Sequence, residues 1–358
     1  MKIYRAASRH NISDYNSLME LFYKGTERVG LKTIILGDVC GQPILLASPI
    51  NPNSNLKNLL VVAGIHGEEP AGCWATIQFI LKENPELFSM VNISILPVFN
   101  PSGFISRSRN NTKGERTNVF IGNPSEEGKL IISKSDLLSK LGSDCVLSLH
   151  ENITVKDEFY LYANTDETEG YDDGSAKSPF RLGGITADLL EIAIQRGLTR
   201  FKIREDGVYK DDQGVEGDEY EIEGGIITNL KDGSFEDYMN RIKGCPVVIL
   251  PETPCDGQAI KNRIDTHLDI IKGIAHYLAI DLSKDCCNPL IIPVPIAKQT
   301  THNSCGGASL NSALRYYGLN KTEKQINDLC EVSNNGIEPE KIVEVAQKFG
   351  LKSRLIKG

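Results

Sequence analysis

The sequence predicts an α/β protein with a mixed, mostly parallel sheet flanked by helices, followed by a small, mainly helical C-terminal domain. Short apolar runs alternate with segments of helical periodicity as far as about residue 280, which is the pattern of layered α/β proteins. Three of these runs are followed closely by a histidine or a glutamate, and strand ends are where such proteins place their chemistry. Near residue 285 the composition changes, which indicates a second part of the chain.

The individual elements follow from the same patterns. Apolar or β-branched runs predict strands at 32–36, 43–48, 58–63, 91–98, 144–149 and 246–250. Helical periodicity predicts helices at 15–23, 70–82 and about 266–280. Pro70 suits the first turn of the second helix, and Gly41 separates the first two strands as the turn of a hairpin.

Composition and charge exclude several classes of protein. The chain has 358 residues with a net charge of −8, so we expect no nucleic-acid partner. No apolar run approaches the roughly 18 residues of a membrane-spanning helix, and the N-terminus lacks the apolar segment of a signal peptide. The nine cysteines are scattered without a C-x-x-C pair, which is typical of reduced thiols. We therefore expect a cytoplasmic protein, and its oligomeric state stays open.

Charge and proline content predict three parts along the chain. Residues 285–297 contain three prolines and are predicted to be a linker. From residue 298 to 358, nine Lys/Arg and six Asp/Glu give a charge of +3, although the whole chain carries −8. We therefore predict a catalytic domain at 1–284, a linker at 285–297 and a helical domain at 298–358.

Two histidines and one glutamate point to a metal site. His66 and Glu69 follow the strand at 58–63, and His150 follows the strand at 144–149, 84 residues after His66. A single histidine at a strand end is more often a structural residue, but three candidate ligands at strand ends of one domain favour metal binding. Two histidines and one carboxylate leave a coordination position open, which is typical of a catalytic site for one zinc ion.

Two further residues suit hydrolytic chemistry. Glu252 ends the strand at 246–250 and there can accept a proton from water and pass it to a leaving amine. Arg109 lies in a loop rich in Arg and Asn after Pro101, and such side chains polarise a carbonyl or hold a carboxylate. Taken alone, the glutamate also fits a helix cap or an ion pair, and the loop also fits a solvated surface.

In this combination the segment 58–254 resembles the zinc carboxypeptidases of the funnelin type. It is most similar to their compact bacterial branch, which includes murein-peptide amidases, and to the related acylase/desuccinylase branch. The matching motifs are H-x-x-E at 66–69, N-P-x-G at 100–103, R-x-N-x-x-G-x-x-x-N at 109–118, the histidine of S-L-H-E at 150, G-S-x-x-D at 233–237 and the glutamate at 252.

The resemblance implies a role for each matching residue. His66, Glu69 and His150 would bind zinc, and Glu252 would act as general base and then as general acid. Arg109 would stabilise the tetrahedral oxyanion, and the resemblance gives Asn118 a part in holding the terminal carboxylate of the substrate.

One departure puts the substrate in doubt. The family has an arginine where this chain has Val119, and valine cannot replace a bidentate contact to a carboxylate. Arg116 or Arg107 is the nearest substitute, and Tyr238 is the nearest candidate for the substrate-capping tyrosine of the family. We expect zinc-dependent hydrolysis of an unusual or modified peptide, or of another small amide. An N-acyl amino acid deacylase and a non-catalytic peptide-binding protein are the alternatives.

The C-terminal segment carries a second resemblance. Gln299 precedes Cys305 by six residues, and Cys305 opens a predicted helix. This segment resembles the first half of a papain-like peptidase of the bacteriocin-processing type, which implies a nucleophile at Cys305 and an oxyanion contact from Gln299. No histidine follows His302, so the thiol lacks its base. Three interpretations stay open: a half-domain kept for binding, a chain that is a fragment of a longer product, and a histidine supplied by another subunit. Among the roles for this segment we favour a helical accessory domain.

Overall fold

The computed structural model describes residues 12–165, 184–210, 219–228, 231–280, 303–316, 319, 321–333, 336–351 and 353. The chain forms two compact units, Met1–Leu282 and Ser283–Gly358, and each is described by itself. The predicted linker at 285–297 and Gln299 lie outside the described residues.

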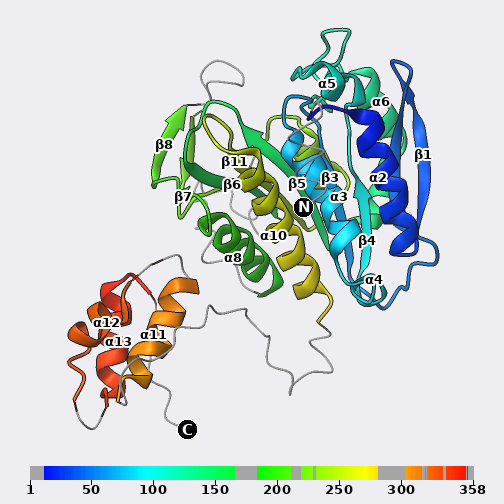
Figure 1. The fold of residues 1–358 in the computed structure, drawn as a ribbon. Coiled ribbons are helices and arrows are strands. Elements are labelled where there is room, and N and C mark those ends of the chain that lie inside the picture. The colour runs from blue at the N-terminus through cyan, green and yellow to red at the C-terminus, as the bar shows by residue number, and fades with distance from the viewer. Residues whose placement is uncertain are drawn as a thin grey trace. The chain divides into compact units, whose positions relative to one another are not determined.

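A nine-stranded mixed sheet forms the centre of the first unit (Figure 1). Its order is β1-β2-β4-β3-β5-β11-β6-β10, with β7 beside β6. The strands are β1 (Leu31–Val39), β2 (Gln42–Pro49), β3 (Asn58–Ala63), β4 (Asn92–Leu96), β5 (Cys145–Asn152), β6 (Glu158–Thr165), β7 (Lys202–Ile203), β10 (Ile226–Thr228) and β11 (Val247–Pro254). Neighbours pair in parallel except for β1/β2, β2/β4 and β6/β11. A separate hairpin joins β8 (Gly207–Lys210) to β9 (Glu219–Ile222).

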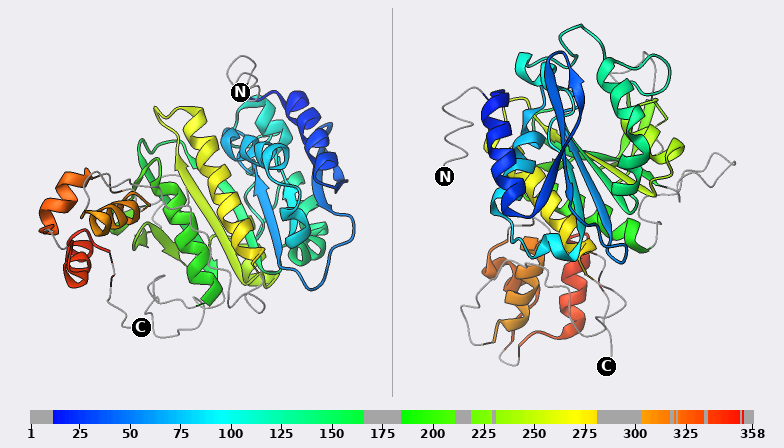
Figure 2. Two further views of the ribbon diagram at one scale, coloured as in Figure 1. Left: turned by 60° about the horizontal axis from the view of Figure 1, so that its bottom comes forward. Right: turned by 90° about the vertical axis from the view of Figure 1, so that its right-hand side faces the viewer.

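Helices cover both faces of the sheet (Figure 2). The larger core packs against α2 (Tyr15–Arg28), α3 (Pro70–Lys82), α8 (Gly184–Leu198) and α10 (Ile260–Leu278). On the other face a smaller core packs against α6 (Glu126–Ser133), α7 (Ser135–Leu141), α9 (Phe235–Asp237) and the π-helical turn η2 (Tyr238–Ile242). Short helices α4 (Leu87–Met90) and α5 (Pro101–Ser106) complete the unit. The predicted fold class, α/β with a mixed and mostly parallel sheet, is confirmed.

The predicted strands and helices are present, with shifted ends. The strand at 58–63 and the helix at 70–82 have the predicted bounds, and the last helix begins earlier, at Ile260. The segment between residues 152 and 247 holds β6 to β10 and α8, which the sequence analysis did not predict. The strands β7 to β10 are short, and β9 alternates charged and apolar residues. A periodicity over several residues therefore does not develop in them.

Two glycines allow the chain to turn sharply after β3. Gly64 has a φ of +68°, a left-handed conformation that other residues adopt only with strain. A Cβ atom on Gly67 would lie 1.9 Å from the carbonyl carbon of Gly103, so only glycine fits there. The turn between β3 and α3 is therefore pressed against α5, and it carries His66 and Glu69.

The described residues of the second unit form three helices, α11 (Cys305–Tyr316), α12 (Glu323–Leu329) and α13 (Pro339–Lys348). They enclose a small apolar core that includes Leu314, Ile326 and Val345. In the described part of the whole chain, no helix has both the length and the apolar character that crossing a bilayer requires.

Candidate metal centre

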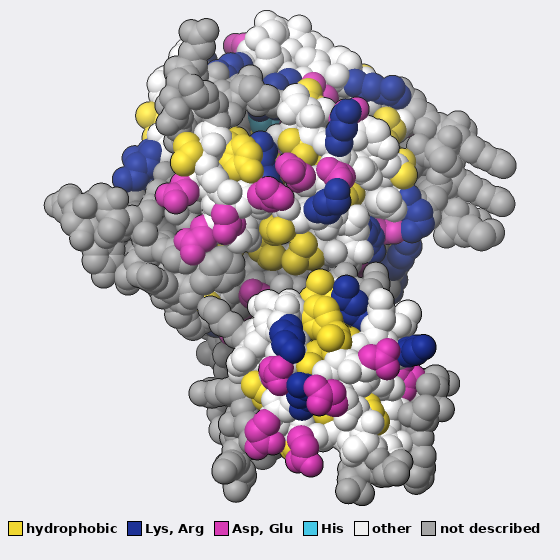
Figure 3. All heavy atoms as spheres, turned by 90° about the vertical axis from the view of Figure 1, so that its left-hand side faces the viewer, with side chains coloured by type: hydrophobic (Ala, Val, Ile, Leu, Met, Phe, Trp, Pro, Cys, Tyr) yellow, Lys and Arg dark blue, Asp and Glu magenta, His cyan; other side chains and the backbone are white. Residues whose placement is uncertain are grey.

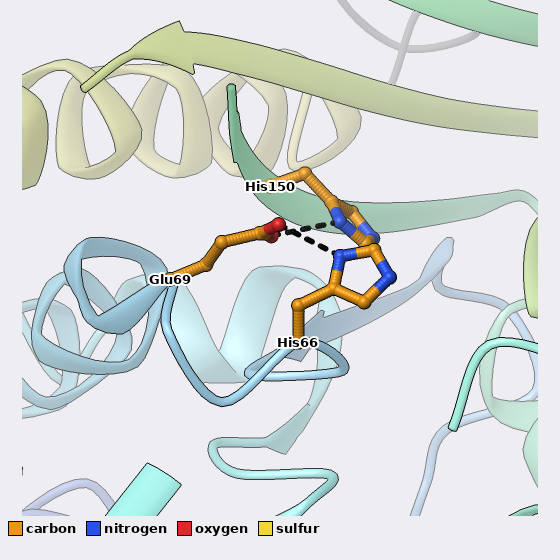
Figure 4. A group of neighbouring side chains, drawn as sticks. All are labelled: His66, Glu69 and His150. Atoms are coloured by element: carbon orange, nitrogen blue, oxygen red, sulfur yellow. Dashed lines mark hydrogen bonds and ion pairs between the residues drawn. The ribbon is translucent and has the colours of Figure 1, made fainter. Parts of the chain in front are cut away.

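His66, Glu69 and His150 form a buried cluster at the ends of β3 and β5 (Figure 4). Each offers one ligand atom, and the three atoms lie within 4.8 Å of one another. Nδ1 of His66 lies 2.7 Å from Oε1 of Glu69, and Nδ1 of His150 lies 3.0 Å from Oε2. Both imidazoles thus turn the same type of nitrogen toward one carboxylate, and the predicted ligands are brought together.

Local structure holds Glu69 in place between the two histidines. Glu69 is the residue before α3, and Pro70 begins the helix. Its side chain does not cap the helix. Instead, Oε2 accepts a hydrogen bond of 3.2 Å from the backbone N–H of Glu151. A main-chain donor on β5 therefore fixes the carboxylate that both imidazoles face.

Glu236 holds the far side of His150. Its Oε1 lies 3.1 Å from Nε2 of His150 and accepts a 2.6 Å hydrogen bond from the hydroxyl of Ser148. Its Oε2 accepts from the side-chain amide of Asn118 at 3.2 Å. In the neutral ring, a carboxylate beside Nε2 would keep the proton there and leave the lone pair of Nδ1 for a metal ion, and such outer contacts orient metal-binding histidines.

Burial and charge act in opposite directions in this cluster. Burial lowers the pKa of His150, but the Glu69 carboxylate and the hydrogen bond to Glu236 outweigh it and hold that pKa well above its ordinary value. Burial raises the pKa of Glu236, yet its contacts with His150 and Ser148 bring it down to about 2. For Glu69, the two histidines likewise outweigh burial and lower the pKa. Both glutamates are therefore anionic at neutral pH.

These donors fit a divalent cation. Two imidazole nitrogens and one carboxylate in a buried site suit zinc, and a cation there would offset the buried negative charge. Metal-bound histidines normally have their second nitrogen hydrogen-bonded, and Glu236 already meets this condition for His150.

Glu252 lies beside the cluster on β11. The register places it directly opposite His150 on β5 and opposite Tyr160 on β6. Its Oε2 atom is buried and has no hydrogen-bond partner among the described residues. Burial raises the pKa of Glu252 to about 8, helped by repulsion from Glu69 and Glu236 and opposed by the positive charges of His150 and Arg109. A carboxyl group with an unoccupied oxygen and a raised pKa suits proton transfer.

Arg109 reaches the cluster from the loop after α5. One guanidinium nitrogen, Nη1, lies 3.4 Å from Oε1 of Glu69 and 3.6 Å from Oε1 of Glu68. The side-chain amide of Asn111 supports the loop by donating 2.8 Å hydrogen bonds to Glu115 and Glu127. A cation is thus held at the edge of the metal cluster with its side chain still one-third exposed.

The predicted substrate-binding residues lie in other surroundings. Asn118 Oδ1 accepts a 2.8 Å hydrogen bond from the backbone N–H of Phe235, and its amide donates to Glu236. Arg116 is exposed. Arg107 is also exposed, and its Nε donates to Ser13 at 3.2 Å. The substrate role of these three residues stays a prediction, and the contacts of Asn118 also give it a part in positioning Glu236.

Tyr238 packs away from the metal cluster. Its ring lies 5.6 Å from that of Phe120, and its hydroxyl lies 3.4 Å from that of Ser135. These contacts belong to the smaller core, and the substrate-capping role of Tyr238 stays a prediction.

Sequence reasoning missed two buried glutamates of the site. Glu236 lies inside the recognised G-S-x-x-D motif, but the motif itself does not single it out. Glu151 directly follows His150, accepts a 2.7 Å hydrogen bond from the N–H of Ala71 and pairs with the buried Arg263 of α10. The sequence signal for Glu151 was its position next to a predicted ligand.

In the second unit, Cys305 is exposed at the first position of α11. Within the described residues of that unit, no histidine is present to act as its base.

Known proteins are similar to each part of the chain. The Peptidase C39 family matches residues 293–358. A candidate metallopeptidase structure from Shewanella amazonensis SB2B is 30% identical, with a TM-score of 0.63, and the match covers 75% of this chain and 94% of that one. A candidate metallopeptidase from Shewanella denitrificans OS217 is 28% identical with the same TM-score, and the match covers 75% and 92% of the two chains.

A metallo-carboxypeptidase from Burkholderia cenocepacia shares the fold at 13% identity and a TM-score of 0.51, with 75% of this chain and 69% of that chain covered. No curated protein matches the chain.

Proposed function

Because this chain belongs to the family of the Shewanella metallopeptidase structures, we propose that it is a zinc-dependent hydrolase of a peptide or amide bond. The observation that carries the proposal is the meeting of His66, Glu69 and His150 in one buried cluster with Glu252 directly opposite His150.

His66, Glu69 and His150 would hold the zinc ion. When bound, the ion supplies Lewis acidity, which acidifies water and polarises a carbonyl. Its positive charge would also lower the pKa of Glu252 from the value of about 8 that burial produces, because a nearby cation favours the carboxylate form. Glu252 would then be ionised near neutral pH, as a general base must be.

Glu252 and Arg109 divide the remaining chemistry. Glu252 would accept a proton from the attacking water at its unoccupied Oε2 and return it to the nitrogen of the leaving amine. The Arg109 guanidinium would stabilise the negative charge that develops on the carbonyl oxygen. Its long contacts to Glu68 and Glu69 leave donors available for that oxygen.

We propose a carboxypeptidase or amidase that acts on an unusual or modified peptide. A deacylase of N-acyl amino acids is the second candidate, because Val119 offers no charge to a terminal carboxylate and both ends of the Asn118 amide already bond the α9 segment. For the C-terminal unit we propose a helical accessory role, because its described residues form three helices around a small apolar core.

The proposal is tested by hydrolysis of three substrate sets: peptides, γ-glutamyl amides and N-acyl amino acids. We expect zinc-loaded protein to cleave members of one set, chelator to remove the activity, and added zinc to restore it. Analysis of metal content should give about one zinc per chain, since one cluster of this kind is present in the described residues. Less than half an equivalent of zinc, or activity that survives chelation, would contradict the proposal.

Glu236→Gln should weaken zinc binding without unfolding the protein. The amide keeps the size of the side chain but supplies a weaker acceptor to Nε2 of His150, and loss of such outer contacts typically costs about 10- to 100-fold in metal affinity. Competition with a chromogenic chelator measures the change in Kd. Glu221→Gln, an exposed glutamate on β9, is the matched control, and equal Kd values for the two variants would refute the role of Glu236.

A further inference from the structure

We propose that Arg204 recognises an acidic group of the substrate on the β6 side of the metal centre. This inference rests on the proposed hydrolytic function and adds a specificity-determining residue, one that would select amides with a carboxylate near the scissile bond.

A tyrosine connects Arg204 with the candidate base. Tyr160 pairs with Glu252 across β6 and β11, so their side chains leave the same face of the sheet. The Tyr160 hydroxyl accepts a 2.7 Å hydrogen bond from the amide of Asn152 on β5. Because β11 lies between β5 and β6 and Asn152 pairs with Pro254, this bond spans β11 between the positions of Glu252 and Pro254. Burial and the Glu252 carboxylate raise the pKa of Tyr160, so its hydroxyl stays protonated.

Two aromatic faces hold the Arg204 guanidinium. Its central carbon lies 5.1 Å from the ring centre of Tyr160 and 4.2 Å from that of Tyr209. The backbone N–H of Arg204 donates to the carbonyl of Phe159 at 2.9 Å, which anchors the residue next to Tyr160. Stacking on aromatic rings orients a guanidinium without using its N–H donors.

One donor of Arg204, at Nε, lacks a hydrogen-bond partner in the part of the chain that the structure describes. Its side chain is 15% exposed, and its ion pair with Glu158 is long, at 3.8 Å from Nε. The buried Nε atom has no hydrogen-bond partner within the described ranges. Leaving donors of a charged group unsatisfied in a largely buried position is costly, and a carboxylate satisfies a guanidinium through two parallel hydrogen bonds.

The surroundings of Arg204 favour a direct contact between this residue and a carboxylate over a general attraction by many basic side chains. Tyr160, Ile222 and Ile227 form a small apolar cluster, with Tyr162, Tyr209 and Tyr220 packed against it. On this side of the molecule, apolar, acidic and basic side chains are interspersed (Figure 3). Val119 is apolar and Arg116 is exposed, whereas Arg204 is a largely buried cation stacked on the tyrosine that pairs with Glu252.

Matched substrates show whether the recognised carboxylate lies on the acyl side or on the leaving-amine side of the scissile bond. For a compound that the wild-type protein hydrolyses, each carboxylate is converted in turn to its carboxamide, on the acyl side or on the leaving-amine side. We expect wild-type kcat/KM to fall about 10- to 100-fold for one of the two conversions, mainly through KM, which is the range of a charged hydrogen bond. The sensitive conversion identifies the side that Arg204 contacts.

Variants of Arg204 assign the selectivity to this residue. Arg204→Gln should bring the acid-to-amide ratio to within about 3-fold of unity, and Arg204→Lys should keep part of the ratio, because a single charge replaces the bidentate fork. Arg200→Gln breaks a surface ion pair with Asp269 and should keep the full ratio. If Arg204→Gln slowed acid and amide equally or left the ratio unchanged, Arg204 would be a structural residue and the proposal would be overturned.

A binding measurement keeps the test independent of turnover. Glutarate should bind zinc-loaded wild-type and Arg200→Gln protein in calorimetry, with a Kd about 10-fold or more lower than for Arg204→Gln. Any contact of glutarate with the metal is common to all three proteins, so only Arg204 distinguishes them. Equal affinities, or no binding to the wild type, would overturn the inference. If no substrate were hydrolysed but the wild type still bound glutarate more tightly than Arg204→Gln, the proposed function alone would be overturned.

Discussion

Glu252→Gln should abolish hydrolysis and leave zinc binding intact. Glutamine has nearly the same shape, but its amide cannot accept a proton from water, and general base catalysis contributes about 100- to 10,000-fold to rate. Zinc content should stay at the wild-type level, because the ligand atoms come from His66, Glu69 and His150. The loss should appear in kcat as well as in kcat/KM, since the residue acts during the reaction.

Glu86→Gln is the matched control for this change. Glu86 is an exposed glutamate just before α4, and its replacement should leave kcat/KM within about 2-fold of the wild type, as surface changes generally do. Near-normal turnover of Glu252→Gln, with the same substrate and full zinc occupancy, would show that another group is the base.

The pH dependence of stability provides a separate test of the raised pKa of Glu252. In the zinc-free protein its pKa is raised to about 8, whereas an unfolded glutamate titrates near 4.3. The folded form therefore favours the protonated carboxyl, and Glu252 costs no stability below the unfolded pKa but an increasing amount as pH rises toward 8. The Tm advantage of zinc-free Glu252→Gln over the wild type should thus grow by a few degrees between about pH 5 and pH 8. A constant difference across this interval would contradict the raised pKa.

His150→Ala should eliminate specific zinc binding. His150 supplies a ligand nitrogen, so its loss should raise the zinc Kd by more than the roughly 100-fold that outer contacts produce. The change also leaves Glu69 and Glu236 buried without their cationic partner, and breaking a buried pair costs about 3–5 kcal/mol. Zinc competition and urea unfolding of the zinc-free protein measure these two effects separately.

His276→Ala controls for the removal of a histidine. His276 lies on α10 with its side chain 56% exposed and 3.5 Å from Glu83, so we expect zinc affinity and stability close to those of the wild type. Retention of stoichiometric, tight zinc by His150→Ala would mean that the cluster is not the metal site.

The order of ligands along the chain was predictable from local patterns. His66, Glu69, His150 and Glu252 each follow an apolar run, and parallel strands bring their carboxyl ends to one edge of a sheet. The observed register places Glu252 opposite His150, as that rule leads one to expect. The fold class followed from the same runs, because a strand buried between two layers of helices is a continuous apolar run, whereas the helices keep a period of about 3.6 residues.

Other parts of the site depend on contacts between distant segments. Glu236 is 86 residues from His150 and 118 from Asn118, and its short helix carries no periodicity that marks a site. Arg204 lies in a region of short strands whose pairing places it over Tyr160 and Tyr209. The local pattern of apolar and polar residues shows which strands are buried and where each strand ends, and so it reveals the metal ligands. The partners that orient those ligands, and the cation that we propose selects the substrate, follow from packing between elements, which no local pattern encodes.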